Sequence, residues 1–397
     1  KDQIEKVLIE EMRLEALSST DADRQKELLR NVNKLYNSAG KESMLKESQH
    51  LPLVPVNNDA FDKDDYLINT TNYVIDLRTG KQIPHNKNLL LNKMTEVTLS
   101  KREPKQFLKF FDDIFQGNKE IEHYVHKALG YSLTGDCREQ CMFWLVGDGN
   151  DGKSLLLQII QEVIGDYSIT SNPDLLLDKK TQSANLSEVA RLKGIRFCVV
   201  NELKMGDKLN ESAIKDITSG NNKIVARFLY ANEFEFLPKM KIWIATNYLP
   251  IIRGTDKGIW RREVVIPMTR SLRDDEVDQN LIYKLRTEKN EIFTWLVEGC
   301  LLWQKEGLKL PQCLMQEKEA YRTDMDLVQK WINENCELGS YTTKATELFE
   351  NFKNYCKVNN EYEMSQTLFG RNFGKKFRKR FCSGVTVYDG IRVRSEI

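Results

Sequence analysis

The sequence predicts an α/β fold built on a mostly parallel sheet, and two observations lead to this prediction. Between residues 140 and 270, short apolar runs alternate with stretches whose apolar residues lie three and four positions apart. In addition, the first apolar run leads through a glycine-rich loop into a helical pattern that ends at Gly165. Alternating strands and helices are typical of parallel sheets with helical crossovers. The expected strands are Phe143–Val146, Arg196–Val200, Ile242–Thr246 and Glu263–Pro267.

The glycine-rich loop matches the phosphate-binding pattern G-x-x-x-x-G-K-[ST] at every fixed position. Between a strand and a helix, such a loop binds polyphosphate through backbone N–H groups and the helix N-terminus. We expect Lys153 to meet the β- and γ-phosphates of ATP and the Ser154 hydroxyl to bind Mg²⁺. The alternative, a glycine-rich turn with a chance lysine, is disfavoured because the motif and its flanks agree. The predicted nucleotide-binding residues are Gly147, Asp148, Gly149, Asn150, Asp151, Gly152, Lys153 and Ser154.

Polar residues follow two further strands of the predicted sheet. Asn201 and Glu202 come directly after an apolar strand, which is the position of the acid that serves ATP hydrolysis. We expect Glu202 to activate the attacking water, and Asn201 to bind metal only weakly because its amide is neutral. Asn247 ends the strand at 242–246, where its amide can bond the γ-phosphate or the water. The alternatives are a solvated acid and a structural turn cap.

The loop that follows Asn247 carries three arginines and two glycines. An arginine inserted into a neighbouring subunit's site can stabilise the charge that develops on a transferred phosphoryl group. We take Arg261 as the first candidate for this catalytic role and Arg253 and Arg262 as reserve candidates. The alternative is a solvated basic loop.

Bulk properties limit the possible classes of protein. The 397 residues allow two or three domains, and the composition, 41% hydrophobic and 29% charged, is ordinary for a soluble protein. No apolar run approaches ~20 residues, which disfavours a membrane span, and there is no secretory signal, so we expect a cytoplasmic location. Because the net charge is only +1, nucleic-acid binding requires local patches. The chain starts with Lys1 and not Met, so we interpret it as a piece of a longer protein.

Eight cysteines without a C-x-x-C pair fit a reducing compartment. One cluster, His123, His126, Cys137 and Cys141, has enough ligands for zinc. The favoured alternative places both histidines on an amphipathic helix and packs both cysteines as small apolar residues.

We divide the chain into three regions. Residues 1–130 combine helices with a β-hairpin: the helical patterns cover 1–49, 104–115 and 120–128, and the strand-like runs are 66–69 and 73–77, with a tight turn at 78–81. Residues 131–310 hold the motifs described above, and a helical pattern covers 275–306. Residues 325–397 form a small module with helical patterns at 328–335, 343–357 and 365–380 and a hairpin through Asp389-Gly390. Three helices followed by a two-stranded wing predict a winged-helix arrangement.

The loop 147–154, Asn201-Glu202, Thr246-Asn247 and Trp260–Arg262, at these spacings, resemble the superfamily 3 helicases of the AAA+ class. The nearest branch is that of the phage and plasmid primase–helicases, to which the poxvirus primase–helicase is related. Leu129–Gln140 is also similar to that branch, as is Ile252–Asp256. The resemblance covers roughly residues 50–310 and, loosely, the tail. It implies an AAA+-like P-loop ATPase core, preceded by a collar-like region and followed by a winged-helix-like, nucleic-acid-binding domain.

The resemblance also implies a hexameric ring around single-stranded DNA, with ATP at subunit interfaces and 3′-to-5′ translocation. In the family, a β-hairpin grips DNA and precedes the strand that corresponds to 242–246 here. Residues 223–229 and 233–237 are similar to the two strands of that hairpin. We expect Lys223 and Arg227 to reach phosphates, and Tyr230 at the tip, beside Asn232, to stack on a base. The chain lacks the Lys and His that viral members often carry at this tip, and Asn201 replaces an acid.

The tail has the densest positive charge. Phenylalanines 373, 377 and 381 recur every four residues, which predicts one helix with an apolar face and outward cations. We expect that helix to contact DNA phosphates; the alternative is a solvated surface helix. Its predicted DNA-binding residues are Lys375, Lys376, Lys379 and Arg380.

Together these features predict an ATP-dependent DNA helicase motor for phage- or plasmid-type replication, as the helicase part of a primase–helicase or primase–polymerase. The alternative is an ATP-binding replication initiator or adaptor that binds DNA with little or no unwinding. The expected partners are single-stranded and forked DNA, further copies of the chain, and a primase or polymerase module, in cis before Lys1 or in trans. A phage-encoded protein of this kind acts in the host cytoplasm.

Overall fold

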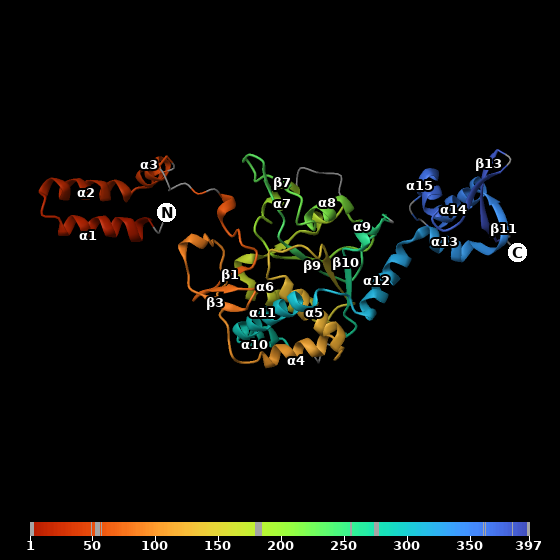
Figure 1. Ribbon diagram of the computed structural model, residues 1–397, viewed down its shortest axis with the longest axis horizontal. Helices are drawn as coiled ribbons and strands as arrows, with labels where there is room; N and C mark the ends of the chain where they lie inside the picture. Colours follow the sequence, from red (N-terminus) through yellow and green to blue (C-terminus); the bar gives the residue numbers. More distant parts are fainter. Residues whose placement is uncertain are drawn as a thin grey trace. The chain divides into compact units, whose positions relative to one another are not determined.

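The structure is a computed structural model of the chain (Figure 1). It describes residues 4–48, 50–51, 56, 58–178, 185–254, 256–273, 278–359, 361, 363–382 and 384–394. The chain divides into two compact units, Lys1–Lys63 and Asp64–Ile397, and each is described by itself. Within the described ranges, no helix is long and apolar enough to cross a membrane.

The first unit is helical, which confirms the prediction for residues 1–49 as far as they are described. Asp21 caps α2, because its carboxylate accepts a hydrogen bond from the Asp23 N–H at 2.9 Å. The apolar core of the unit is small and is formed by Ile9, Val32 and Leu35. Its elements are a π-helix (Ile4–Ile9), α1 (Glu10–Ser18), α2 (Ala22–Leu35), α3 (Ser38–Ser48) and a 3₁₀ turn (Asn58–Ala60).

The second unit is organised around a five-stranded sheet of order β10–β4–β9–β6–β5, in which all neighbouring strands are parallel. The predicted parallel sheet and its four predicted strands are confirmed, and these strands are almost entirely buried, as parallel strands with helices on both faces are. The sequence gives no strand signal for β5, because this short edge strand has three polar residues and no apolar run. The strands are β4 (Met142–Val146), β5 (Ser168–Ser171), β6 (Phe197–Asn201), β9 (Lys241–Thr246) and β10 (Glu263–Pro267).

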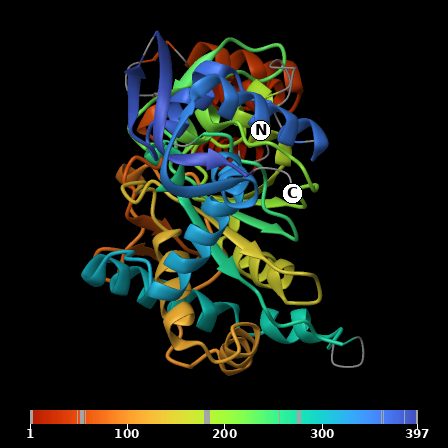
Figure 2. The same cartoon turned by 90° about the vertical axis from the view of Figure 1, so that its right-hand side faces the viewer.

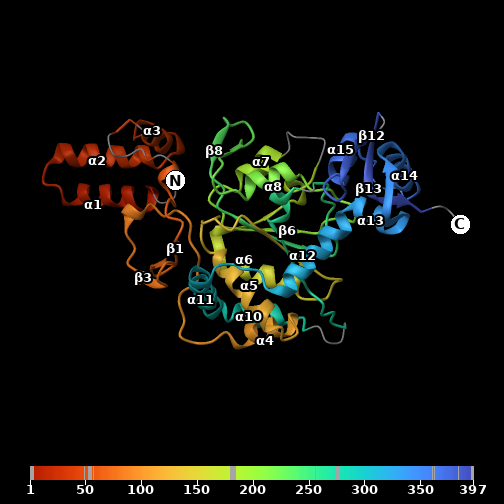
Figure 3. The same cartoon turned by 45° about the vertical axis from the view of Figure 1, so that its right-hand side comes forward.

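Helices cover both faces of this sheet and form two apolar cores (Figures 1 and 3). One core is closed by α4 (Lys105–Ile114), α5 (Lys119–Tyr131), α6 (Lys153–Ile164), α10 (Leu281–Arg286) and α11 (Lys289–Glu306). The other is closed by α7 (Asn185–Ala190), α8 (Glu211–Ile217), α9 (Lys257–Trp260) and α12 (Gln312–Met325). Short 3₁₀ turns lie at Lys87–Leu89, Gly165–Tyr167 and Pro173–Leu175. The helices predicted at 104–115 and 120–128, and within 275–306, are present.

Two smaller β-structures accompany the main sheet. The antiparallel strands β1 (Leu67–Asn69), β2 (Val74–Asp76) and β3 (Lys81–Ile83) include the predicted turn at 78–81. The buried Arg196, next to β6, binds this small sheet to the core: its guanidinium donates to the carbonyls of Leu133 (2.8 Å) and Leu67 (2.9 Å). The antiparallel hairpin of β7 (Ile224–Ala226) and β8 (Phe234–Phe236) lies where the sequence predicts one.

Residues 327–394 form a small module with an apolar core of its own (Figure 2). Its three strands form an antiparallel sheet of order β11–β13–β12. The helices predicted at 328–335 and 343–357 are present. In chain order the elements are α13 (Leu327–Asn335), β11 (Cys336–Lys344), α14 (Ala345–Val358), α15 (Gln366–Phe373), β12 (Lys379–Cys382) and β13 (Val385–Val393).

Two predictions for this module are wrong. The expected basic helix over 365–380 ends at Phe373, so Lys375 and Lys376 follow in a turn, whereas Lys379 and Arg380 lie on β12. The four-residue repeat was misleading because Phe373 and Phe377 pack in the core while Phe381 is 76% exposed on an edge strand.

The expected turn at Asp389-Gly390 is the second error, since β13 runs through both residues. Pairing with β11 holds the strand extended on either side, and Gly390, at φ 93°, lies where the register with β11 shifts. The module therefore has a three-stranded sheet, and the turn lies between β12 and β13.

Candidate functional site

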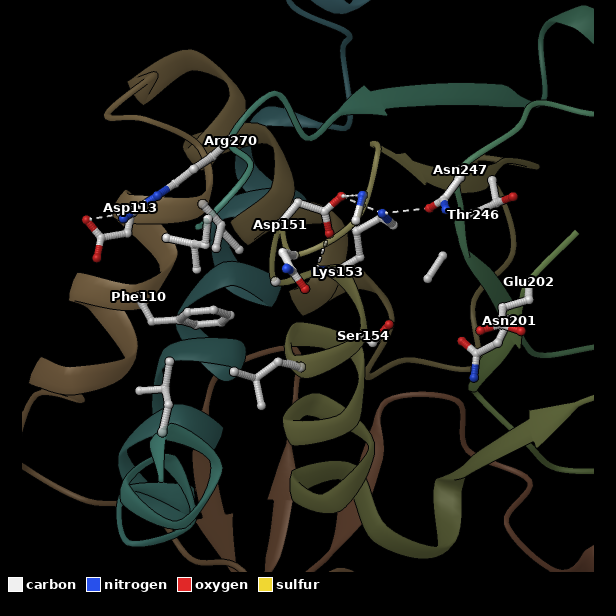
Figure 4. A pocket seen from close by; sticks show the side chains of 18 of the residues that line it. Phe110, Asp113, Asp151, Lys153, Ser154, Asn201, Glu202, Thr246, Asn247 and Arg270 are labelled. Atoms are coloured by element: carbon white, nitrogen blue, oxygen red, sulfur yellow. Dashed lines mark hydrogen bonds and ion pairs between the residues drawn. The ribbon is translucent and has the colours of Figure 1, made fainter. Parts of the chain in front are cut away.

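The loop between β4 and α6 has a backbone shape that its glycines permit. Gly149 and Gly152 have φ values of 110° and 85°, in the region that favours glycine. A Cβ at Gly152 would lie 2.7 Å from the side chain of Ile114 on α4, so only glycine fits there. The loop is thus packed against α4 and leads directly into the N-terminus of α6, whose first N–H groups lack helical partners (Figure 4).

Lys153, the first residue of α6, is only 5% exposed, and its ammonium group has three partners. Its Nζ pairs with the Asp151 carboxylate and donates to the Gly147 carbonyl at 2.8 Å. It also donates to Asn247 Oδ1 at 3.2 Å, and Asn247 follows β9, the neighbour of β4 in the sheet. The structure therefore brings Lys153 into direct contact with the Asn247 amide, which the sequence predicted to bond the γ-phosphate or the water (Figure 4).

Asn201 and Glu202 lie at the carboxyl end of β6, on the other side of β9. Both side chains are exposed and line the same cavity as Lys153, Ser154 and Asn247 (Figure 4). Glu202 leaves the strand with φ 53°, while its N–H still donates to the Ala245 carbonyl at 3.0 Å. Because β4, β9 and β6 are adjacent and parallel, polar residues that are far apart in the sequence meet at one edge of the sheet.

The cavity has a volume of about 1130 Å³, and the sequence motifs do not predict one of its walls. That wall comes from α4, α10 and the chain after β10, which lie beside the loop. An ion pair between Asp113 and Arg270, at 3.1 Å, joins two of these segments. The apolar spacing of 104–115 indicated a buried helix face but not which element it meets. The apolar residues that line the cavity near the loop are Phe110, Ile114, Leu155, Leu272 and Leu281.

None of the three candidate arginines lines this cavity. Arg253 and Arg261 are exposed, and Arg261 bonds to the Gln140 side chain. Arg262 is only 6% exposed and donates to Thr218 Oγ1 at 2.8 Å and to a backbone carbonyl; burial lowers its pKa. Arg261 is therefore open to an outside partner, whereas Arg262 is occupied inside its own chain.

The backbone around Arg261 is held by α12. Lys318 Nζ donates to the Arg261 carbonyl at 3.3 Å. The Tyr321 hydroxyl donates to the Pro250 carbonyl at 2.5 Å, and its ring contacts the Trp260 ring edge-on, with centroids 5.3 Å apart. One helix thus fixes both the chain that follows Asn247 and the segment that carries Arg261.

The hairpin predicted to grip DNA has an exposed aromatic tip. Tyr230 is fully exposed, and its φ of 61° turns the chain between the two strands. Lys223 lies 3.9 Å from Glu235, and Arg227 lies 3.9 Å from Glu233, in exposed pairs that solvent screens. Asn232 is exposed next to this tip.

The four tail cations differ in their surroundings. Lys376 pairs with Asp326 at 2.8 Å, and Arg380 pairs with Asp389 at 2.7 Å. Lys375 and Lys379 are exposed, and Lys379 has no ion pair within the part of the chain that the structure describes. Two of the four cations that were predicted to contact phosphate, Lys376 and Arg380, thus already form ion pairs with acids of the same chain.

The histidines of the His/Cys cluster have partners other than a metal. His123 Nε2 lies 2.7 Å from Glu306 Oε2, and His126 Nε2 lies 2.7 Å from the Trp295 carbonyl. Both histidines lie on α5, and burial lowers the pKa of His126 to about 4. Cys137 and Cys141 are buried. Over the described ranges, no three His, Cys, Asp or Glu side chains are placed to hold a metal ion.

Comparison with known families gives two matches. Residues 1–116 match the model described as "D5 N terminal like", and residues 145–262 match a "Family of unknown function (DUF5906)". The second range contains the loop, both strand ends and the arginine segment described above.

The similarity to viral proteins covers most of the chain. "Putative helicase L207/L206" of Acanthamoeba polyphaga mimivirus is 28% identical over 354 residues, which cover 83% of this chain and 37% of that protein. "Putative primase C962R" of African swine fever virus is 24% identical over 331 residues, 77% of this chain and 34% of that protein. The chain is thus similar to viral proteins that are named as putative helicases and putative primases. These matches support the primase–helicase relationship that the motifs predicted.

The chain spans about a third of the length of these curated relatives. A solved structure, the apo C-terminal region (305–718) of NrS-1, is 12% identical and covers 74% of this chain and 77% of its own, with a TM-score of 0.49.

Proposed function

We propose that this relative of the primase–helicases is an ATP-hydrolysing helicase motor that acts on single-stranded and forked DNA during replication. The observation that carries the proposal is the 3.2 Å hydrogen bond from Lys153 to Asn247, because it joins the phosphate-binding loop to the end of a neighbouring strand inside one cavity. The names of the viral relatives, helicase and primase, support the same role.

The residues present fit a nucleoside triphosphate. A Cβ at Gly149 would meet no atom within 4 Å, so open space adjoins the loop backbone where phosphates would bind. Lys153 supplies a buried ammonium, and the start of α6 supplies N–H groups. The apolar wall of Phe110, Leu272 and Leu281 is suited to a flat nucleobase. ATP is therefore the proposed cofactor, with its phosphates at the loop.

The proposed Mg²⁺ ligands are oxygen donors at the same edge of the sheet. The Ser154 hydroxyl, the Asn201 amide and the Glu202 carboxylate are the kinds of ligand that this cation takes. When bound, the metal ion would neutralise phosphate charge. Glu202 is also the proposed general base for the attacking water, because its exposed carboxylate borders the cavity. Asn247 is proposed to orient the γ-phosphate or that water.

The arginine that completes the site is proposed to come from another copy of the chain. Arg261 is exposed and absent from the cavity of its own chain, which suits a group supplied in trans to an interface. Such an arrangement requires an oligomer, and a hexameric ring is the proposed form. Arg253 stays the reserve candidate, whereas the burial of Arg262 favours a structural role.

Two surfaces are proposed to contact DNA. The β7–β8 hairpin offers Tyr230 for stacking on a base and Lys223 and Arg227 for phosphates. The order α13–β11–α14–α15–β12–β13 supports a winged-helix type of module, in which β12 and β13 form the wing. In that module Lys379 on the wing is the proposed phosphate contact.

The test measures ATP turnover with and without single-stranded DNA, and then unwinding of a forked duplex. DNA-stimulated turnover together with unwinding is the expected result. Turnover without unwinding would favour an AAA+ initiator, and nucleotide binding without turnover would favour an adaptor with a degenerate site, for which the neutral Asn201 is the motivating observation. Imaging with a non-hydrolysable ATP analogue and single-stranded DNA would report the ring.

A further inference from the structure

The phosphate-binding loop contains an acidic side chain that points inward. Asp151 is 3% exposed, and its carboxylate forms an ion pair with Lys153 Nζ. The same carboxylate accepts hydrogen bonds from the Lys153 N–H at 3.2 Å and from the Gly149 N–H at 3.4 Å. One side chain thus engages the Lys153 ammonium group, which lies beside it in Figure 4, and two backbone donors of the loop.

These donors are of the kind that binds phosphate in such a loop: backbone N–H groups at a helix N-terminus and the lysine of the motif. The Asp151 carboxylate lies deep in the loop, because a Cβ added at Gly147 would lie 2.3 Å from its Oδ2. A phosphate oxygen and this carboxylate are both anionic, so they cannot share the Lys153 ammonium without repulsion.

The second acid of the loop behaves differently. Asp148 is exposed and has no ion pair or hydrogen bond within the described part of the chain. The loop therefore has one acid that engages the donors and one that only adds charge nearby, which makes the two aspartates a matched pair for experiment.

We propose that Asp151 is an affinity-determining residue of the nucleotide site: a resident counter-ion that holds Lys153 in the nucleotide-free loop and competes with phosphate for it. The inference rests on the proposed function, since it assumes that phosphates bind at this loop. Binding then requires the Asp151–Lys153 pair to open, and the free energy of that pair is subtracted from the free energy of nucleotide binding. The pair also stabilises the empty loop.

The first measurement is the dissociation constant for ADP without Mg²⁺, for the wild-type chain, Asp151→Asn and Asp148→Asn. Asn keeps the size of Asp and an oxygen that can accept from the Gly149 N–H, but it lacks the charge. We expect Asp151→Asn to bind ADP on the order of tenfold more tightly than wild type. This is a typical size for the coupling free energy when two anions, here phosphate and the Asp151 carboxylate, compete for one cation. Asp148→Asn should tighten binding less, because it reports only the general effect of removing one charge from the loop.

The second measurement is the melting temperature without nucleotide. Asp151→Asn should melt at a lower temperature than wild type, because Lys153 stays buried without its counter-ion. Saturating ADP should reduce that difference, since phosphate then replaces the lost anion. Asp151→Glu, which keeps the charge, should bind ADP with an affinity closer to wild type. Asp151→Ser provides a second neutral variant if the Asn variant does not fold.

Equal or weaker ADP binding by folded neutral variants would overturn the inference. Asp151 would then be a structural residue that holds the loop in the conformation that binds nucleotide. If neither the wild type nor any variant binds ADP or pyrophosphate, the proposed function fails instead. Tighter binding by the neutral variants at position 151, beyond the effect at position 148, supports both.

Discussion

The strand-end cavity and the C-terminal module both carry charged side chains that the proposed function needs, but the structure holds these side chains in different ways. Lys153 is buried and bonded to the loop and to the end of β9. The tail cations are exposed, and two of the four pair with surface acids. A side chain fixed by packed elements can contribute to a reaction in one geometry, whereas exposed cations contribute mainly to the local field. Substitutions in the two regions should therefore differ in size and in kind.

The largest effect is expected from Lys153→Ala, which should abolish ATP turnover because the phosphates lose their buried cation. The same change leaves the Asp151 carboxylate buried without its counter-ion, so the melting temperature without nucleotide should fall as well. Turnover and thermal unfolding are measured side by side, with Lys81→Ala on the exposed strand β3 as the control. Normal turnover in a folded Lys153→Ala protein would disprove the assignment of the loop.

Glu202→Gln should reduce ATP hydrolysis by about two orders of magnitude or more, because glutamine keeps the shape of the side chain but cannot accept the proton of the attacking water. ATP binding should persist at near-normal affinity, since Glu202 is exposed after the end of β6 and is not part of the β4–α6 loop. Single-turnover hydrolysis and equilibrium binding separate the two effects. If hydrolysis survives the substitution, Glu202 is not the general base, and another acid of the cavity must have that role.

Arg261 offers a test of whether the cavity is complete within one chain. Arg261→Ala and Lys153→Ala proteins should each be inactive, but mixed oligomers should recover part of the ATPase, because an intact Lys153 can then face an intact Arg261. Arg262→Ala should instead lower the melting temperature, since it removes the buried bond to Thr218. Absence of recovery with Arg261, and also with Arg253, would argue against a shared site.

The smallest effect is expected in the C-terminal module, where neighbouring residues on β12 form a natural pair. Lys379→Gln should reduce the slope of log affinity against log salt by about 0.7 on single strands or 0.9 on duplex, the value for one phosphate contact. Arg380→Gln should change the slope less, because Asp389 already accompanies that charge. DNA affinity is measured at several salt concentrations. Equal slopes for all three proteins would mean that this surface serves a partner other than DNA.

The two regions also differ in how well the sequence predicted them. In the cavity, the loop motif and the apolar strands carried enough local information to place Lys153, Asn247 and Glu202 at one sheet edge. In the tail, the four-residue repeat of phenylalanines predicted a helix that ends at Phe373, because strand pairing of 379–382 with β13 outweighs local helical spacing. Local periodicity therefore predicted the buried strands well and the edge strand β12 poorly.

By itself, the sequence determined the parallel sheet, the glycine-rich loop between β4 and α6 and the polar residues at the strand ends, because strong apolar runs and an eight-residue motif are local signals. Only the tertiary structure decided which helices form the second wall of the cavity, which arginine is buried, and that Asp151 occupies the loop donors. Each of these depends on contacts between residues far apart in the chain, such as Gly152 against Ile114 or Arg262 against Thr218. Spacing along the sequence does not reveal such contacts, since the way in which side chains pack in the folded chain determines which residues meet.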